Sequence, residues 1–200
     1  LSSLTQNPYE LTIDSIKLVN QIANQIIRNF GTLSTLSFSY EQAMGVLDAI
    51  DAAAEAAVRL DKATSVLSTT EILETLSLFS SLISSQLVAG QENVEYVHDT
   101  FRISSLRQMR SANSSLQIVS PSTLLERSTG TSSSSVTIES DATASRLLST
   151  SADSEEEFSV NMVTNSASSY GPLGESFNTN PVQLTVSRTS TTPTRATFTL

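Results

Sequence analysis

Residues 87–104 read LVAGQENVEYVHDTFRIS, and the pattern of the chain changes within this stretch. Before Gly90, apolar residues recur every three or four positions, as they do on one face of an α-helix. From Val94 onward, apolar and polar residues alternate, as they do in a half-buried strand. The sequence therefore predicts an α+β fold, with a helical subdomain over residues 1–90 and an antiparallel β-sandwich subdomain over residues 91–200.

The helical half contains sequences typical of helix starts, in which a capping side chain is followed three residues later by Glu or Gln. They are Asn7 to Glu10, Ser39 to Gln42 and Ser68 to Glu71. Gly31 and Gly90 are expected to end the first and the third helix, because glycine readily adopts the left-handed conformation common at helix ends. The pattern predicts about three helices.

Two of these helices carry distinctive faces. The alanines of residues 52–57 allow a neighbouring helix to approach the second helix closely, whereas its acidic face, which includes Asp51, is expected to be solvated. The third helix has a broad apolar stripe and serines where charged residues are usual. We expect Leu76, Phe79 and Ile83 in this stripe to lie in a core shared by helices and sandwich.

Several short segments in the second half alternate like strands. They lie at residues 94–104, 116–119, 136–138, 158–163, 182–186 and 196–200. Leu124-Leu125 and Leu147-Leu148 predict brief helical turns, and the hydroxyl-rich or acidic stretches 128–135 and 140–157 predict loops. Because residues 196–200 alternate without a closing turn, we expect a sandwich that is truncated at its C-terminal end.

Composition limits the partners of the chain. The formal net charge is −9, and only 11 Lys and Arg residues are present, so binding to the phosphate backbone of nucleic acids is not expected. Charged residues make up 16%, below the usual quarter or so, and Ser and Thr take their place in the second half. The sequon Asn113-Ser114-Ser115 makes Asn113 the candidate glycosylation site. No apolar run reaches the roughly 18 residues of a transmembrane helix.

The residues that carry chemistry are few. His98 is the single histidine, and no Gly-x-Ser-x-Gly elbow accompanies it, so we expect no catalytic residues, no enzyme and no small-molecule substrate, and interpret His98 as a surface or interface residue. With no Cys, a metal site would need oxygen ligands. Asp153 and residues 155–157 are acidic but lack the spacing of a calcium loop, so a solvated loop is expected, with neither metal nor cofactor.

The order of these segments resembles the GAIN domain of adhesion receptors and polycystin-family proteins. The resemblance rests on the helices followed by Glu95–Ser104, Leu116–Pro121, Tyr170-Gly171-Pro172 and Asn180–Val186, and it is nearest to polycystin and receptor-for-egg-jelly-like members. In that family a helical subdomain precedes a β-sandwich, which ends in an autoproteolysis motif just before the membrane. The family's cleavage signature lies near paired cysteines and tryptophans, both absent here, so no cleavage residue is transferred.

The resemblance implies a non-catalytic, extracellular structural and interaction domain of a polycystin-like or adhesion-type membrane protein. Its location would be the extracellular face of the plasma membrane, including that of a cilium or flagellum. Its partners would be other extracellular domains, surface-coat proteins or its own membrane-embedded region. The alternative is a glycosylated subunit of an extracellular filament or surface coat, in which exposed strands pair with neighbouring copies.

Overall fold

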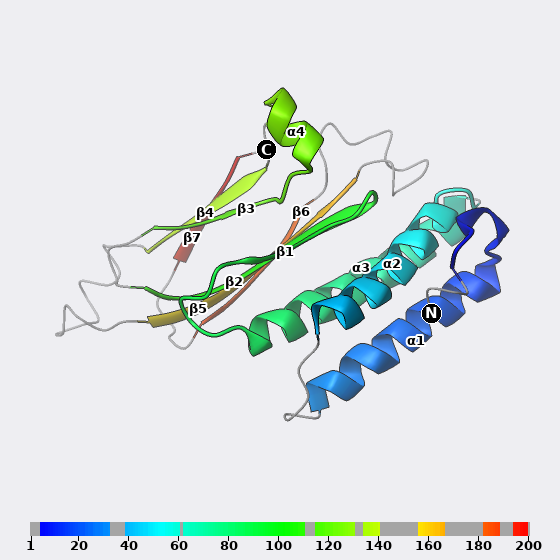
Figure 1. The fold of residues 1–200 in the computed structure, drawn as a ribbon, viewed down its shortest axis with the longest axis horizontal. Helices are drawn as coiled ribbons and strands as arrows, with labels where there is room; N and C mark the ends of the chain where they lie inside the picture. The colour runs from blue at the N-terminus through cyan, green and yellow to red at the C-terminus, as the bar shows by residue number, and fades with distance from the viewer. Residues whose placement is uncertain are drawn as a thin grey trace.

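The computed structural model describes residues 5–32, 39–60, 62–110, 115–130, 134–140, 156–166, 182–188 and 194–199. The helical part consists of the 3-10 turn η2 (Pro8–Glu10) and the helices α1 (Ile13–Thr32), α2 (Tyr40–Ala57) and α3 (Lys62–Gln86). The strands are β1 (Val94–Val97), β2 (Phe101–Arg110), β3 (Leu116–Val119), β4 (Ser135–Ser140), β5 (Glu156–Asn165), β6 (Val182–Arg188) and β7 (Thr194–Thr199), with the short helix α4 (Leu124–Thr129) after β3. The predicted α+β class, with helices before an antiparallel β region, is confirmed (Figure 1).

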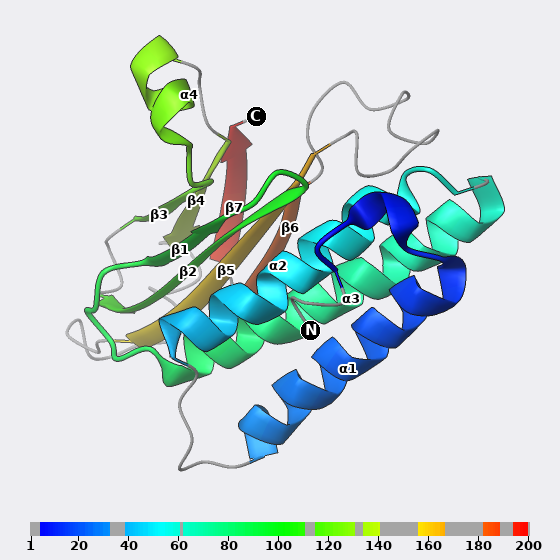
Figure 2. The same ribbon diagram turned by 45° about the vertical axis from the view of Figure 1, so that its right-hand side comes forward.

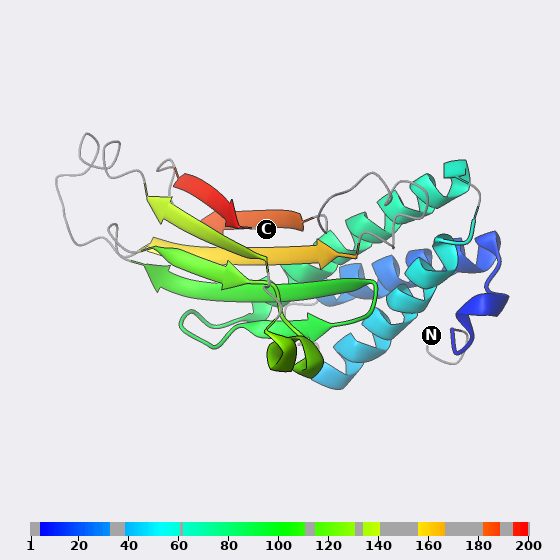
Figure 3. The same cartoon turned by 90° about the horizontal axis from the view of Figure 1, so that it is seen from above.

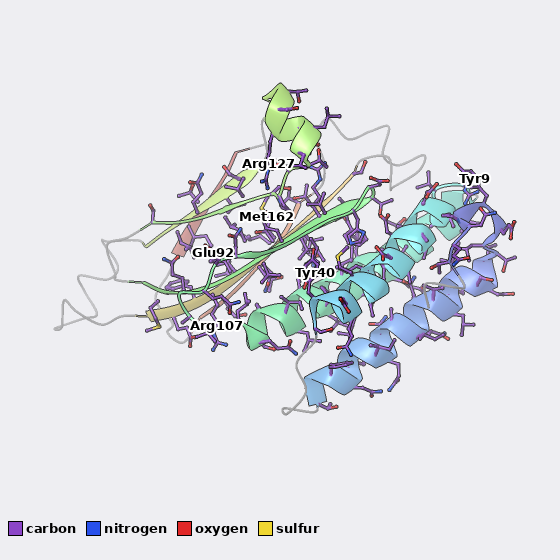
Figure 4. The ribbon with its side chains drawn as sticks, viewed as in Figure 1. Tyr9, Tyr40, Glu92, Arg107, Arg127 and Met162 are labelled. Carbon is purple, nitrogen blue, oxygen red and sulfur yellow. The ribbon has the colours of Figure 1, made fainter. Side chains whose placement is uncertain are left out.

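The strands form two antiparallel sheets that face each other. The first sheet has the order β1-β2-β5-β6 and the second the order β3-β4-β7 (Figure 3). Phe158, Val160 and Met162 of β5 point into the space between the sheets, where they pack against apolar residues of β3 and β4. Figure 4 shows Met162 in this position. Since side chains alternate along a strand, the intervening residues of β5 face the helices.

The helices cover the other face of the first sheet. Helix α3 lies against β2 and β5, and α1 packs on α2 and α3 on the side away from the strands (Figures 1 and 2). Leu76, Phe79 and Ile83 are buried as expected, in one core with sheet residues such as Ile103 and Val163. The first sheet is therefore covered on both faces.

The alanine-rich face of α2 allows the close packing that its sequence predicts. Ala49, Ala53 and Ala56 pack against Ile16 and Val19 of α1. Other alanines of α2 contribute to the core shared with α3. Small side chains on two faces let α2 pack closely against both α1 and α3.

The predicted start of the first helix and the predicted glycine cap at its end are wrong, although the helix ends close to where the sequence predicts. Asn7 caps only the turn η2, because Leu11 is extended, with φ −70° and ψ 124°, and interrupts the helical backbone. Helix α1 starts after Thr12, whose hydroxyl accepts a hydrogen bond from the Ser15 amide. At the other end, Gly31 lies inside α1 without a positive φ.

The third helix also starts earlier than its capping sequence predicts. It begins at Lys62 rather than at Ser68. Hydroxyl side chains inside a helix can bond back to carbonyls three or four residues earlier, and Thr75 and Ser84 do so here. The backbone of Ser68 lies inside α3. The change from helix to strand nevertheless lies where the sequence places it, and Gly90, in the following turn, has φ +88°.

The strand regions differ from expectation mainly in length. Strands β2 and β5 pair along ten residues each, further than their alternating segments predict, because polar residues also occupy the ladder. The turn predicted at Leu124-Leu125 is confirmed and forms the start of α4. The bounds of the expected loop 128–135 are wrong, because α4 extends to Thr129 and β4 begins at Ser135. Leu147-Leu148 and most of the acidic stretch lie outside the described residues.

Candidate functional site at the interface of helices and sandwich

Polar side chains of the helices and of the first sheet meet at several points of an otherwise apolar interface. One contact lies at the turn between β1 and β2, a second joins the middle of β5 to the last turn of α3, and a third lies where α3 ends. We call these the hairpin contact, the central contact and the helix-end contact. They are the most specific polar features that join the two parts of the fold.

At the hairpin contact, a carboxylate of α2 holds the turn between β1 and β2. Oδ1 of Asp51 accepts hydrogen bonds from the amide of Thr100, at 3.0 Å, and from its hydroxyl. The carbonyl of Thr100 in turn accepts a hydrogen bond from the amide of Ser166, which follows β5. The expectation that the whole acidic face of α2 is solvated is therefore wrong for Asp51.

His98 lies at the same contact, in the turn rather than in a strand. Its side chain is 6% exposed, and its Nδ1 lies 3.7 Å from Oδ1 of Asp48. Its ring packs on that of Phe101, with 4.9 Å between the centroids, and its buried Nε2 has no hydrogen-bond partner within the described residues. Burial lowers the pKa of His98, while the charges of Asp51, Asp48 and Asp99 oppose this shift.

Aromatic rings extend the hairpin contact toward α2 and α3. The ring of Tyr96 stacks on Tyr40, at the start of α2, and makes a T-shaped contact with Phe79 of α3, with 5.6 Å between centroids in both pairs. Burial, and secondarily the neighbouring Tyr40, raise the pKa of Tyr96. The hairpin is thus held by aromatic packing as well as by Asp51.

The central contact is a buried amide and hydroxyl pair. Nδ2 of Asn161 donates to Oγ of Ser84 at 3.1 Å. Ser105 lies opposite Asn161 in the ladder, and its buried hydroxyl has no partner among the described residues. At least one serine of α3, Ser84, therefore faces the sheet. The sequence alone does not assign a partner to any of these serines.

At the helix-end contact, Arg107 of β2 caps α3. Its guanidinium donates to the carbonyls of Ser85 and Leu87, at 3.2 and 3.0 Å, and its Nε donates to Oε1 of Glu157 at 2.6 Å. A cation at the C-terminal end of a helix also interacts favourably with the helix dipole. Figure 4 shows Arg107 beside the end of α3.

The arginine contact gives a measurable effect. Arg107→Met is expected to lower the free energy of unfolding by about 1 to 2 kcal/mol, because the helix carbonyls lose their donor and Glu157 loses its cation. Urea unfolding followed by circular dichroism measures the change. The matched control is Arg127→Met: Arg127 is 60% exposed and pairs with Glu95 at 3.6 Å, so a smaller loss is expected. Equal losses in the two variants would contradict the capping role of Arg107.

An open groove lies where α1, α3 and the β5–β6 edge of the first sheet meet. Its volume is about 520 Å³, and its lining mixes apolar Leu73, Leu78 and Val182 with polar and charged residues such as Arg28 and Glu74. Arg28 and Glu74 are exposed, and the hydroxyl side chains of Thr70 and Ser77 also line the groove.

Helix α4 stands away from the sandwich and is fixed by charge (Figure 2). Glu126 accepts a hydrogen bond from Arg102 at 2.6 Å and closes a capping box with Thr123. Arg102, followed by the Thr123 amide, lowers the pKa of Glu126 to about 2. Since an acid with a lowered pKa stabilises the fold above its ordinary pKa of 4.5, this contribution is lost as the pH falls toward 2.

The site residues expected from the sequence have different outcomes. Asn113 lies outside the described residues, as do Asp153 and Glu155. Glu157, expected in a solvated loop, lies in β5 and pairs with Arg107, so that expectation is wrong for it. In the part of the chain that the structure describes, no three or more His, Cys, Asp or Glu residues are grouped to hold a metal ion, and no helix has the length and hydrophobicity to cross a membrane.

The contacts of Asp51 and Arg107 are absent from the sequence-based expectations because their partners lie 20 or more positions away along the chain. No local motif marks such pairs.

Neither the comparison with protein families nor the comparison with characterised proteins gives a match for this chain.

Proposed function

We propose that this chain is a structural and interaction domain of an extracellular surface protein, of the GAIN-like kind found in polycystin-like and adhesion-type membrane proteins. The observation that carries the proposal is the attachment of an N-terminal helical layer to a sandwich through one apolar core and polar contacts at both ends of β2. Because these contacts join the two parts, a force applied to one is transmitted to the other. This is a useful property for a domain between a ligand and a membrane.

The surface chemistry supports the same proposal. The second half is rich in Ser and Thr and carries the sequon at Asn113, which suits a glycosylated surface. The net charge of −9 disfavours nucleic acid as a partner, so other extracellular domains, surface-coat proteins or the protein's own membrane-embedded region are the proposed partners. No catalytic role is proposed for His98, because its neighbours are carboxylates and an aromatic ring rather than a nucleophile.

The test is the state of the protein in its own cells. Antibodies raised against this chain are expected to label intact, unpermeabilised source cells. The chain secreted by cultured eukaryotic cells is expected to exceed the bare mass of 21.4 kDa and to lose part of the excess in the Asn113→Gln variant. The matched control Asn93→Gln, which alters no sequon, should leave the glycan mass unchanged. Labelling only after permeabilisation, together with a bare mass, would contradict the proposal.

The filament or surface-coat alternative is favoured by the sheet edges. Within the described residues, β1 and β6 are the outer strands of the first sheet, and the backbone groups of outer strands can pair with another chain. Light scattering of the same secreted material separates the two candidates. A constant mass of one chain at rising concentration favours the interaction domain, and growing assemblies favour the coat subunit.

A further inference from the structure

The hairpin contact combines a buried histidine with the carboxylates that hold the turn. His98 is the single histidine of the chain, and it lies where the β1–β2 turn meets α2. The turn is held by Asp51 through the amide and the hydroxyl of Thr100, two residues from His98. Any change in the charge of His98 therefore acts directly on the contact between the helices and the sandwich.

We infer that the hairpin contact is a pH-sensitive joint, which is closed when the His98 imidazole is neutral and opens when the imidazole takes up a proton at mildly acidic pH. Opening means that the β1–β2 turn separates from α2 while the sandwich stays folded. The trigger is binding of one proton from water to a ring nitrogen, and no other ligand is needed. The joint concerns only these two layers, whatever the function of the parent protein.

The packing around the ring explains why the charged imidazole is unfavourable in the closed joint. An imidazolium has two N–H donors, but the buried Nε2 has no acceptor within the described residues and the ring lies against Phe101. Asp48 lies 3.7 Å from Nδ1, beyond hydrogen-bond distance, and its side chain is largely exposed, so its attraction is screened by water. Leaving a charged donor without a partner in a buried site is costly, and separation of the turn lets water solvate it.

The charged groups around His98 decide the sign of the effect. Asp48 and Asp51 face it from α2 and Asp99 from the turn itself, while β2 contributes the uncharged ring of Phe101. The carboxylates favour protonation, but burial outweighs them and the pKa of His98 lies below 6.5. The closed joint is therefore fully stable above pH 6.5 and loses stability as the pH falls below it, toward the pKa of the closed form.

The single histidine allows a direct test by NMR on the whole chain. The titration of its two ring C–H signals, at Cδ2 and Cε1, is expected to give a pKa below 6.5. Between pH 7 and pH 5, hydrogen exchange of the Thr100 amide should show a falling protection factor, by up to about tenfold per pH unit for a one-proton process. The amide of Val160 in the sandwich serves as the internal reference and is expected to keep its protection factor.

Variants test the cause of this loss. In His98→Gln and His98→Phe, which do not titrate in this range, the protection factor of the Thr100 amide should stay constant. His98→Phe also keeps an aromatic ring at this position, so it serves as the test if His98→Gln folds poorly. Asp48→Asn removes an opposing charge and should lower the pKa of His98 further, whereas the exposed Glu55→Gln on the same helix should leave it unchanged. A pKa above 6.5, equal loss of protection at Val160, or the same pH dependence in both His98 variants would overturn the inference.

Discussion

Phe79→Ala is expected to lower the free energy of unfolding by about 3 to 5 kcal/mol, as for other large-to-small substitutions in a packed core. The Phe79 side chain is fully buried, and it makes a T-shaped contact with the Tyr96 ring from the sandwich. Its removal leaves a cavity at the point where α3 supports the hairpin. Chemical denaturation followed by helix circular dichroism measures the change.

Leu124→Ala is the matched control for Phe79→Ala. Leu124 is also a large apolar residue in a helix, but it is 84% exposed on α4, so its truncation should change stability by no more than about 0.5 kcal/mol. Similar losses in the two variants would mean that the stripe of α3 does not support the core.

Phe158→Ala is expected to have an equally large effect, about 3 to 5 kcal/mol, at the opposite face of the first sheet. Phe158 is buried between the two sheets, in a core that contains no helix residue. Because the polar contacts and the shared core join helices and sheet, we expect this change to shift the loss of helix signal as well. The measurement is denaturation followed in parallel in the helix region and in the strand region of the far-ultraviolet circular dichroism spectrum.

A comparison of the two probes decides whether the parts unfold together. All four tyrosines lie in the helical half or in β1, or outside the described residues, so circular dichroism in the strand region is needed to follow the sandwich. Coincident transitions in wild type and in both variants indicate one cooperative unit. A helix transition that stays in place in Phe158→Ala would show that the sandwich unfolds independently of the helices.

Much of the helical layer could be predicted from local signals. The capping box formed by Ser39 and Gln42 is present, and the apolar stripe around Phe79 is buried, because capping and periodicity depend on residues within one or two turns. The start of α3 could not be predicted in this way, because Ser68 fits both a cap and a helix interior. Boundaries depend on tertiary packing when two local choices are nearly equal.

Little of the candidate site could be predicted from the sequence. Asp51 is indistinguishable in sequence from a solvated acid of an amphipathic helix, and Arg107 lies in a polar stretch with weak alternation. Their roles come from partners in other elements, at Thr100 and at the end of α3. The sequence shows that His98 is the single histidine, but its burial, and the lack of a partner for its Nε2 within the described residues, follow only from the way the hairpin meets α2.

The sequence by itself determined the order of the elements: helices first, a change of pattern at Gly90, and then antiparallel strands. Periodicity and the ability of glycine to adopt a positive φ are local properties, and they belong to the sequence whether or not the chain is folded. Only the tertiary structure decided that the first sheet is covered on both faces. It also decided that the contacts of Asp51, Asn161 and Arg107 join the helices to this sheet. Such contacts form between residues far apart in the chain, where the local pattern carries no information about distance.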